Sequence, residues 1–180
     1  MVDEKKEKWM NYMAITTVLI AVCATFSTFR GGGYGTKSLM NQTQASDKWA
    51  EYEAKSIKSY IYGMQKDNFE IQKEMITQTA SNKAMIDKYQ EKIDGYNKKL
   101  KQYEQDKADI MNEAKAFEAA KANCTLHSGA FGIAVIFLQI SILLSSISAL
   151  AKKRYIYLFS LIVGAVGVVY FFDGFFLFIK

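Results

Sequence analysis

The hydrophobic residues of this chain gather in three blocks, which restrict the folds open to it. Hydrophobic residues make up 50% of the sequence, and they concentrate in Met13–Phe29, Ala130–Ala151 and Tyr155–Ile179. About 20 apolar residues in a helix suffice to cross a hydrocarbon layer of ~30 Å. Proline, the commonest helix breaker, is absent from the sequence. The sequence therefore predicts an all-α membrane protein with three transmembrane helices in the lipid bilayer.

The long polar stretch between the first two blocks carries a heptad repeat. From Lys83 to Leu126, one stripe recurs at alternating steps of three and four residues: Ile86, Tyr89, Ile93, Tyr96, Leu100, Tyr103, Ile110, Ala114, Phe117 and Cys124. A stripe with this spacing packs one helix along another. A second stripe runs through Ser38–Ile76 and consists of Ala50, Ala54, Ile57, Ile61, Met64, Asn68, Ile71 and Met75. We expect the two stripes to face each other in a long antiparallel coiled-coil hairpin.

Two segments compete for the tip of this hairpin. Thr77–Asn82 reads TQTASN and is rich in turn and cap formers, with Ser81 or Asn82 able to cap the next helix. A turn at Asp94 and Gly95 would give arms of unequal length and would cut the later stripe. We place the tip near 77–82. The predicted organisation is an N-terminal tail and first transmembrane helix (1–29), an extramembrane helical hairpin (30–129), and transmembrane helices two and three (130–180).

Residues 31–38 read GGGYGTKS, which superficially resembles a phosphate-binding loop. The match fails, because a P-loop needs lysine directly after the last glycine, whereas Thr36 intervenes here. A membrane helix also precedes this segment in place of a buried strand. We expect a flexible exit from the bilayer.

Small residues follow one face of each predicted transmembrane helix. In lipid, helices associate largely through close backbone approach, which small residues permit. Gly164 and Gly167 are therefore candidate assembly residues, and the three helices should form a tight bundle within one chain or between chains. The three small-residue faces comprise Ala14, Thr17, Ala21, Ala24 and Thr28; Ala134, Ser141, Ser145 and Ser148; and Ser160, Gly164, Gly167 and Gly174.

Several residues of the hairpin do not fit a simple apolar seam. Asn68, Lys107 and Lys121 lie on the seams, where polar residues either fix register and oligomer state or mark solvated sections. Trp49, Tyr52 and Tyr60 lie on a flank of the first arm. They are candidates for contact with another subunit, or for packing against the foot of the second arm.

Charge predicts orientation and argues against nucleic acid as a partner. The net charge is +5, but residues 30–129 hold sixteen Lys or Arg against fourteen Asp or Glu, so they form no basic patch. Lysines precede the first apolar block, and Lys152, Lys153 and Arg154 lie between the second and third. Positively charged loops stay in the cytoplasm. In the inner membrane of a Gram-negative bacterium, the N-terminus would then be cytoplasmic and the hairpin periplasmic.

The sequence contains little material for catalysis. His127 is the only histidine and has no Cys, Asp or Glu at metal-ligand spacing. We therefore expect no enzymatic activity, cofactor, metal or small-molecule substrate. His127 is interpreted as a solvated residue at the membrane surface, with pH sensing as the alternative. Gln139 and Asp173 are the candidate polar groups within the bilayer.

Three segments of the chain read ASDKWAEYEAKSIK at 45–58, AVIFLQISILLSSIS at 134–148 and GAVGVVYFFDGFFL at 164–177. Taken together and in this order, they resemble the bacterial membrane-protein family "domain of unknown function 4337". The resemblance covers nearly the whole chain and implies layout and membrane location only. Similar sequences typically carry asparagine where this chain has Asp173, and many interrupt the hairpin with proline.

Two functions remain open at this point. The first is a structural or accessory subunit, a homo-oligomer or part of a larger complex, whose hairpin is an interaction surface. The alternative is an ion- or proton-channel component, because the layout is similar to that of the TolQ and ExbB motor proteins. In that family the large domain is cytoplasmic and a long tail follows the third helix, and both features disagree with this sequence.

Overall fold

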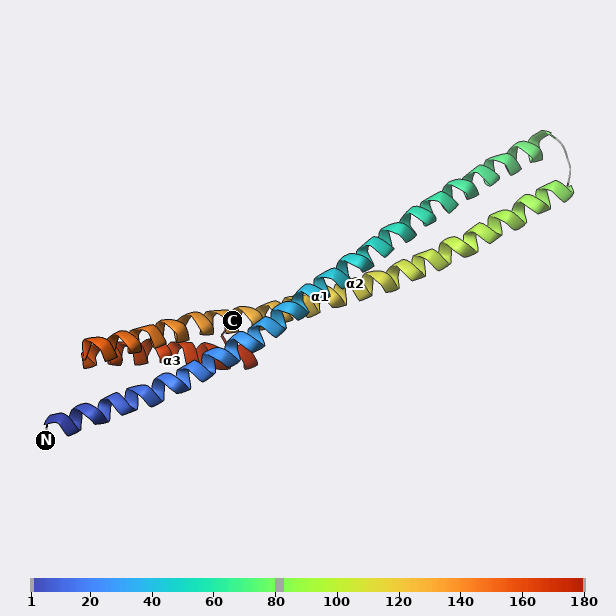
Figure 1. The fold of residues 1–180 in the computed structure, drawn as a ribbon. Helices are drawn as coiled ribbons and strands as arrows, with labels where there is room; N and C mark the ends of the chain where they lie inside the picture. The colour runs from blue at the N-terminus through green and yellow to red at the C-terminus, as the bar shows by residue number, and fades with distance from the viewer. Residues whose placement is uncertain (1, 80–82, 180) are drawn as a thin grey trace. The chain divides into compact units, whose positions relative to one another are not determined.

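The computed structural model describes residues 2–79 and 83–179, with side chains for 9–78 and 83–179. These residues form three helices, α1 (Val2–Thr79), α2 (Lys83–Ala151) and α3 (Arg154–Phe176), and contain no strand (Figure 1). The all-helical prediction is confirmed. Each helix includes a stretch long and apolar enough to cross a membrane.

The chain divides into two compact units. The three-helix unit comprises Met1–Met40 and Ala120–Lys180, and the hairpin unit comprises Asn41–Ala119. Both α1 and α2 contribute to each unit, whereas α3 belongs to the three-helix unit alone. Membrane-length apolar sequence and polar heptad sequence are thus segregated.

The glycine-rich segment 31–38 is helical, so the prediction of a flexible exit is wrong. A glycine inside a helix costs about 1 kcal/mol relative to alanine, which packing can offset. A Cβ on Gly31 would lie 3.0 Å from the Cβ of Phe131, and the Ser128 hydroxyl donates a 3.0 Å hydrogen bond to the Gly31 carbonyl. Gly31 therefore lets α2 approach the α1 backbone closely, and this contact holds the segment in the helix.

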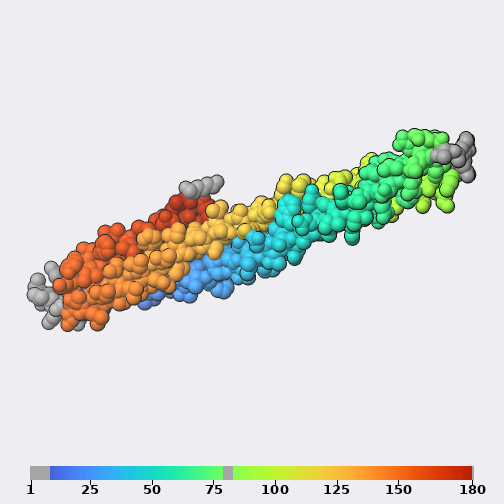
Figure 2. All heavy atoms as spheres, turned by 90° about the horizontal axis from the view of Figure 1, so that it is seen from above, coloured from blue at the N-terminus to red at the C-terminus, as the bar shows by residue number. Residues whose placement is uncertain are grey.

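Within the hairpin unit, α1 and α2 lie side by side in opposite directions (Figures 1 and 2). Lys73 hydrogen-bonds to Gln90 at 2.5 Å, whereas Lys55, earlier in α1, pairs with Asp106, later in α2. Helix α1 is described to Thr79 and α2 from Lys83, and the rival turn at Asp94 and Gly95 lies inside α2. Residues 80–82, including the predicted caps Ser81 and Asn82, lie outside the described part of the chain.

The heptad stripe of α2 is correctly predicted. Ile93, Ile110 and Ala114 are buried. The other predicted residues are half-buried: Ile86, Tyr89, Tyr96, Leu100, Tyr103, Phe117 and Cys124. This face of α2 packs against α1.

The predicted stripe of α1 is wrong, because all eight of its residues are exposed: Ala50, Ala54, Ile57, Ile61, Met64, Asn68, Ile71 and Met75. The face of α1 that packs on α2 instead carries Ala45 and Ser59, which are buried, together with half-buried Tyr62 and Phe69. The aliphatic stripe lies on the other side of the helix. Its exposure is the largest departure from the sequence-based prediction.

Aromatic stacking explains why this face is used. Tyr62 stacks on Tyr103 with ring centroids 5.6 Å apart, and Phe69 stacks on Tyr96 at the same distance. Phe69 also meets Tyr89 at 5.9 Å. Each aromatic pair stabilises packing by about 0.5–1.5 kcal/mol beyond the area it buries. The α2 stripe is rich in tyrosine, and it pairs with aromatic rather than aliphatic residues of α1.

Candidate functional site

Gly164 and Gly167 lie where α3 crosses its neighbours within the chain. A Cβ on Gly164 would meet Ser141 Oγ at 2.7 Å and Ile20 Cδ1 at 3.0 Å. A Cβ on Gly167 would meet the Leu138 side chain at 2.8 Å and its backbone nitrogen at 3.0 Å. Both candidate assembly residues therefore serve packing inside one chain.

The small-residue faces of α2 and α3 are buried as predicted, whereas that of α1 is only partly so. Ala24 is buried, Thr17 and Ala21 are half-buried, and Ala14 and Thr28 are exposed. The buried residues of the α2 and α3 faces are Ala134, Ser141, Ser145, Ser148, Ser160, Gly164, Gly167 and Gly174.

Serine side chains connect α2 and α3 by hydrogen bonds. Ser141 donates to the Ser160 carbonyl at 2.7 Å, and the Ser145 and Ser160 hydroxyls lie 3.0 Å apart. Near the turn, Ser148 donates to the Lys153 carbonyl at 3.0 Å. These hydroxyls are satisfied inside the protein, so the network joins helices and leaves no polar group open to a ligand there.

A polar and aromatic cluster lies near the C-terminal end of α3. The ring of His127 stacks on Tyr34 at 4.6 Å, and its Nδ1 lies 2.8 Å from the Gly174 carbonyl oxygen. A carbonyl only accepts hydrogen bonds, so His127 Nδ1 carries the proton in this contact. His127 is half-buried, and the prediction of a solvated residue is wrong.

Phe131 joins the three helices within this cluster. Its side chain is fully buried and contacts Gly31 of α1 and Gly174 of α3. The ring meets Phe175 edge-on at 5.0 Å, and the Arg30 guanidinium lies 5.5 Å from the Phe175 ring centre. Sequence reasoning missed the His127 and Phe131 cluster. His127 and Phe131 lie about one helical turn apart, beside the small residues Ser128 and Gly129. This spacing was the sequence signal that could have placed them on one face of the helix.

Asp173 is buried, with 3% of its surface exposed, and it organises the end of α3. Its Oδ1 accepts a 2.7 Å hydrogen bond from the backbone N–H of Ile179. Its carbonyl accepts one from the N–H of Leu177, which adopts a left-handed conformation with φ of 50°. The side chain therefore holds the chain where it turns away from the helix.

Substituting Asp173 separates this structural role from an ionic one. Asp173→Asn keeps an oxygen acceptor for the Ile179 N–H, so we expect unchanged thermal stability in detergent. Asp173→Leu removes the acceptor and should cost about 0.5–1.5 kcal/mol, the usual net contribution of one hydrogen bond, because the Ile179 N–H loses its partner in the protein. Thermal unfolding followed by circular dichroism measures both. Equal losses for the two variants would show that the negative charge, rather than the acceptor, stabilises this turn.

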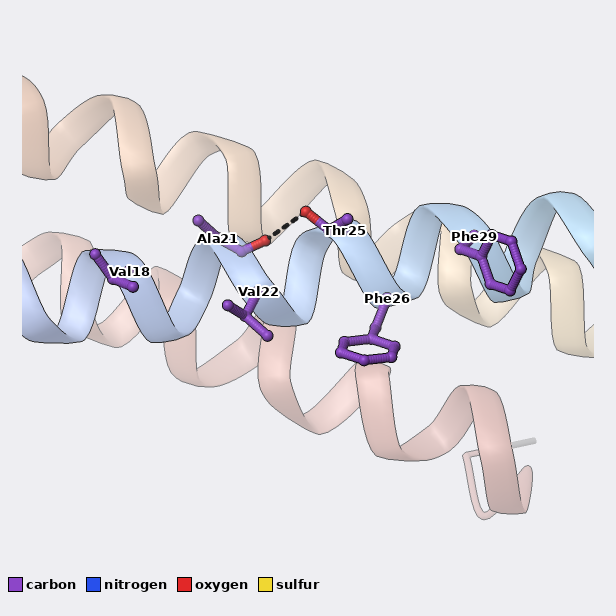
Figure 3. A pocket seen from close by; sticks show the side chains of 6 residues that line it. All are labelled: Val18, Ala21, Val22, Thr25, Phe26 and Phe29. Atoms are coloured by element: carbon purple, nitrogen blue, oxygen red, sulfur yellow. Dashed lines mark hydrogen bonds between the residues drawn. The ribbon is translucent and has the colours of Figure 1, made fainter.

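Gln139 and an apolar groove occupy the outer surface of the three-helix unit. Gln139 is exposed, whereas Asp173 is buried. The groove has a volume of about 460 Å³ and is lined by Val18, Ala21, Val22, Thr25, Phe26 and Phe29, all on α1 (Figure 3). Its one hydroxyl, on Thr25, donates to the Ala21 carbonyl at 2.9 Å. The groove therefore suits acyl chains better than a polar ligand.

The flank residues of the hairpin unit divide into two groups. Trp49 donates from Nε1 to Glu118 at 2.9 Å and meets Tyr52 edge-on, so both pack beside α2. Tyr60 is 70% exposed. Of the polar seam residues, Asn68 is exposed, whereas Lys107 and Lys121 are half-buried.

Ion pairs link the two helices of the hairpin unit. The Lys48 ammonium donates hydrogen bonds to Glu113 and Glu51, which raise its pKa above the ordinary value of 10.5, and a hydrogen bond donated to Asp106 raises the pKa of Lys55. A raised lysine pKa stabilises the fold below the unfolded-state value and loses that contribution as the pH rises through the folded-state value. The side chains of Lys48 and Lys55 are 32% and 28% exposed, so water screens both ion pairs and the contribution is small.

The described residues contain no group of three or more His, Cys, Asp or Glu side chains placed to hold a metal. The fold and these contacts define a class: an all-helical protein with three membrane-length apolar stretches and a polar helical hairpin. The chain belongs to the family described as Domain of unknown function (DUF4337), which matches residues 9–177. Neither the curated proteins nor the solved structures gave a match.

Proposed function

We propose that this protein is a non-enzymatic, oligomer-forming subunit of the bacterial inner membrane. The three-helix unit lies in the bilayer, and the hairpin unit is an antiparallel coiled coil that serves as an interaction surface. The observation that carries the proposal is the exposed aliphatic face of α1 in the hairpin unit. Ile57 and Ile71 there are 61% and 56% exposed.

Exposed apolar residues on all three helices support the membrane location. Phe29 of α1 is 78% exposed, Leu143 of α2 is 63% exposed, and Ile162 of α3 is 64% exposed. Soluble monomers rarely carry large contiguous apolar surfaces. Acyl chains cover such a surface without cost, and the interior glycines and serines supply the close helix contacts that hold a bundle together in lipid.

The positively charged turn supports an orientation. Lys152 and Lys153 between α2 and α3, and Arg154 at the start of α3, are exposed. Under the positive-inside rule this turn is cytoplasmic, and the hairpin is periplasmic.

Thiol labelling tests both the membrane location and this orientation. In a background with Cys23→Ala and Cys124→Ala, Asp87→Cys, at an exposed position of α2, should react with an impermeant maleimide in intact spheroplasts. The control, Lys153→Cys, should react only after lysis. The reverse pattern would place the hairpin in the cytoplasm, and protein extracted by carbonate washing would contradict membrane insertion.

An ion-channel component remains the second candidate, favoured by the buried carboxyl group of Asp173 in a membrane-length helix. Charged groups inside membrane segments often mark ion pathways. Purified protein in liposomes should conduct protons if this candidate is correct, and Asp173→Asn should abolish the flux. Absence of flux in the parent protein would exclude it.

A further inference from the structure

The exposed stripe of α1 has the regular spacing of a heptad seam, although α1 already packs against α2 through its opposite face. Its large apolar members Ile57, Ile61, Met64 and Ile71 are 61%, 47%, 51% and 56% exposed. The steps along the full stripe from Ala50 alternate between four and three residues. The face that packs on α2 lies on the other side of the helix, so the stripe is a second seam rather than the edge of the first.

Asn68, the polar residue of the stripe, indicates what kind of partner helix packs on the stripe. In heptad notation Ile61 and Asn68 occupy a positions, and Ile57, Met64 and Ile71 occupy d positions. A single asparagine at an a position specifies register and oligomer state in parallel coiled coils, because its amide pairs with the same residue of the facing helix. Asn68 is exposed in the single chain, so its amide is available for that pairing.

The flanking charges fit a second copy of the same helix. Glu53 occupies a g position and Lys58 the following e position, and both side chains are exposed. In a parallel pair, residue g faces residue e of the next heptad on the other helix, five residues on. Glu53 of each copy then faces Lys58 of the other, which gives two symmetric ion pairs. In the next heptads, Asp67 faces the neutral amide of Gln72.

The same flanks disfavour a lipid surface as the occupant. Helices that lie on membranes carry lysine and arginine on their polar face, which attract anionic headgroups. The e and g positions here are mainly acidic or neutral, with Lys58 as the one cation: Glu51, Glu53, Lys58, Tyr60, Gln65, Asp67, Gln72 and Glu74. This pattern suits another protein helix.

We propose that a second copy of this chain packs along Ile57, Ile61, Met64, Asn68 and Ile71 of α1, forming a parallel two-stranded coiled coil. The proposal rests on the membrane location proposed above. Two copies inserted in one bilayer have the same direction, and equal lengths of chain separate the membrane stretch from the stripe. The anchors therefore favour the parallel, in-register pairing that Asn68 and the Glu53–Lys58 pairs require.

Disulfide formation in native membranes tests this pairing. In the background lacking Cys23 and Cys124, we expect Ile61→Cys and Asn68→Cys to form disulfide-linked dimers, because facing a positions bring Cβ atoms within bonding range. The matched control is Glu70→Cys, an exposed residue of α1 off the stripe. It should crosslink at least about tenfold more slowly. Equal rates at all three positions, or crosslinks from Asn68→Cys to a different protein, would overturn the proposal.

A second measurement keeps the proposal testable without crosslinking. The triple variant Ile57→Glu, Ile61→Glu and Met64→Glu changes exposed residues only, so the hairpin should fold and keep its helical circular dichroism signal. Light scattering in mild detergent should show a dimer for the parent protein and a monomer for the variant. A parent monomer, or an unchanged dimer in the variant, would refute the stripe as the dimer interface. Carbonate washing of the same membranes reports separately whether the membrane location fails.

Discussion

Gly167→Leu should be among the most destabilising single substitutions in the three-helix unit. A Cβ alone at this position would lie 2.8 Å from Leu138 Cγ and 3.0 Å from the Leu138 backbone nitrogen. A side chain can rotate away, but the α2 backbone cannot, so α3 must separate from α2. In lipid this close contact is the main attraction between helices. We expect a loss of about 3 kcal/mol or more, seen as a lower thermal midpoint in detergent.

Gly132→Leu is the matched control for this substitution. Gly132 also lies in a membrane-length stretch, but a Cβ there would meet no atom within 4 Å. Its substitution should change the midpoint little. If the two leucine variants unfold at the same temperature, α3 does not pack on α2 at Leu138.

Gly164 and Gly167 were predictable because one physical requirement selects them. Membrane helices that associate must bring their backbones close, and only small residues at helical spacing allow this. The same reasoning identified the buried serines of α2, whose hydroxyls the sequence could not pair. It failed for Ala14 and Thr28, because a stripe on α1 shows spacing but not which residues of a 78-residue helix meet a neighbour.

The α2 stripe was predictable because one face of that helix is apolar at most heptad positions between Lys83 and Leu126, with Lys107 and Lys121 as interruptions. In α1 two faces compete at the same spacing. One is aliphatic, through Ile57, Ile61 and Ile71, and the other mixes Ala45, Ser59, Tyr62 and Phe69. Counting aliphatic residues favoured the first, whereas stacking on Tyr96 and Tyr103 of α2 selects the second. The choice depends on the partner helix, which no local pattern contains.

The cluster around His127 could not be assembled from the sequence for a related reason. Its members come from three helices and include Tyr34, Phe131 and Gly174, which are far apart along the chain. The glycine-rich segment was read as flexible because glycine destabilises an isolated helix. The segment is helical because Phe131 packs closely on Gly31, a contact that only the packed structure shows.

Phe131→Ala should produce the largest cavity effect in the three-helix unit. Phe131 has 0% of its surface exposed and meets Phe175, Phe171 and Tyr34 at ring-centre distances of 5.0–6.3 Å. Removing the ring leaves a void where all three helices meet, and we expect a loss of about 3–5 kcal/mol in thermal or denaturant unfolding. Phe159→Ala is the control, because Phe159 is 57% exposed.

A double-mutant cycle with Gly174 tests whether this loss arises from the contact between α2 and α3. A Cβ on Gly174 would lie 2.6 Å from the Phe131 ring, so Gly174→Ala alone should destabilise the protein by about 1–3 kcal/mol through overpacking. Once the ring is gone, the added methyl has room and partly fills the void. Gly174→Ala should then be neutral or stabilising in the Phe131→Ala background. Substitutions at sites that do not touch are additive within about 0.5 kcal/mol, so simple additivity here would refute the packing of α3 on Phe131.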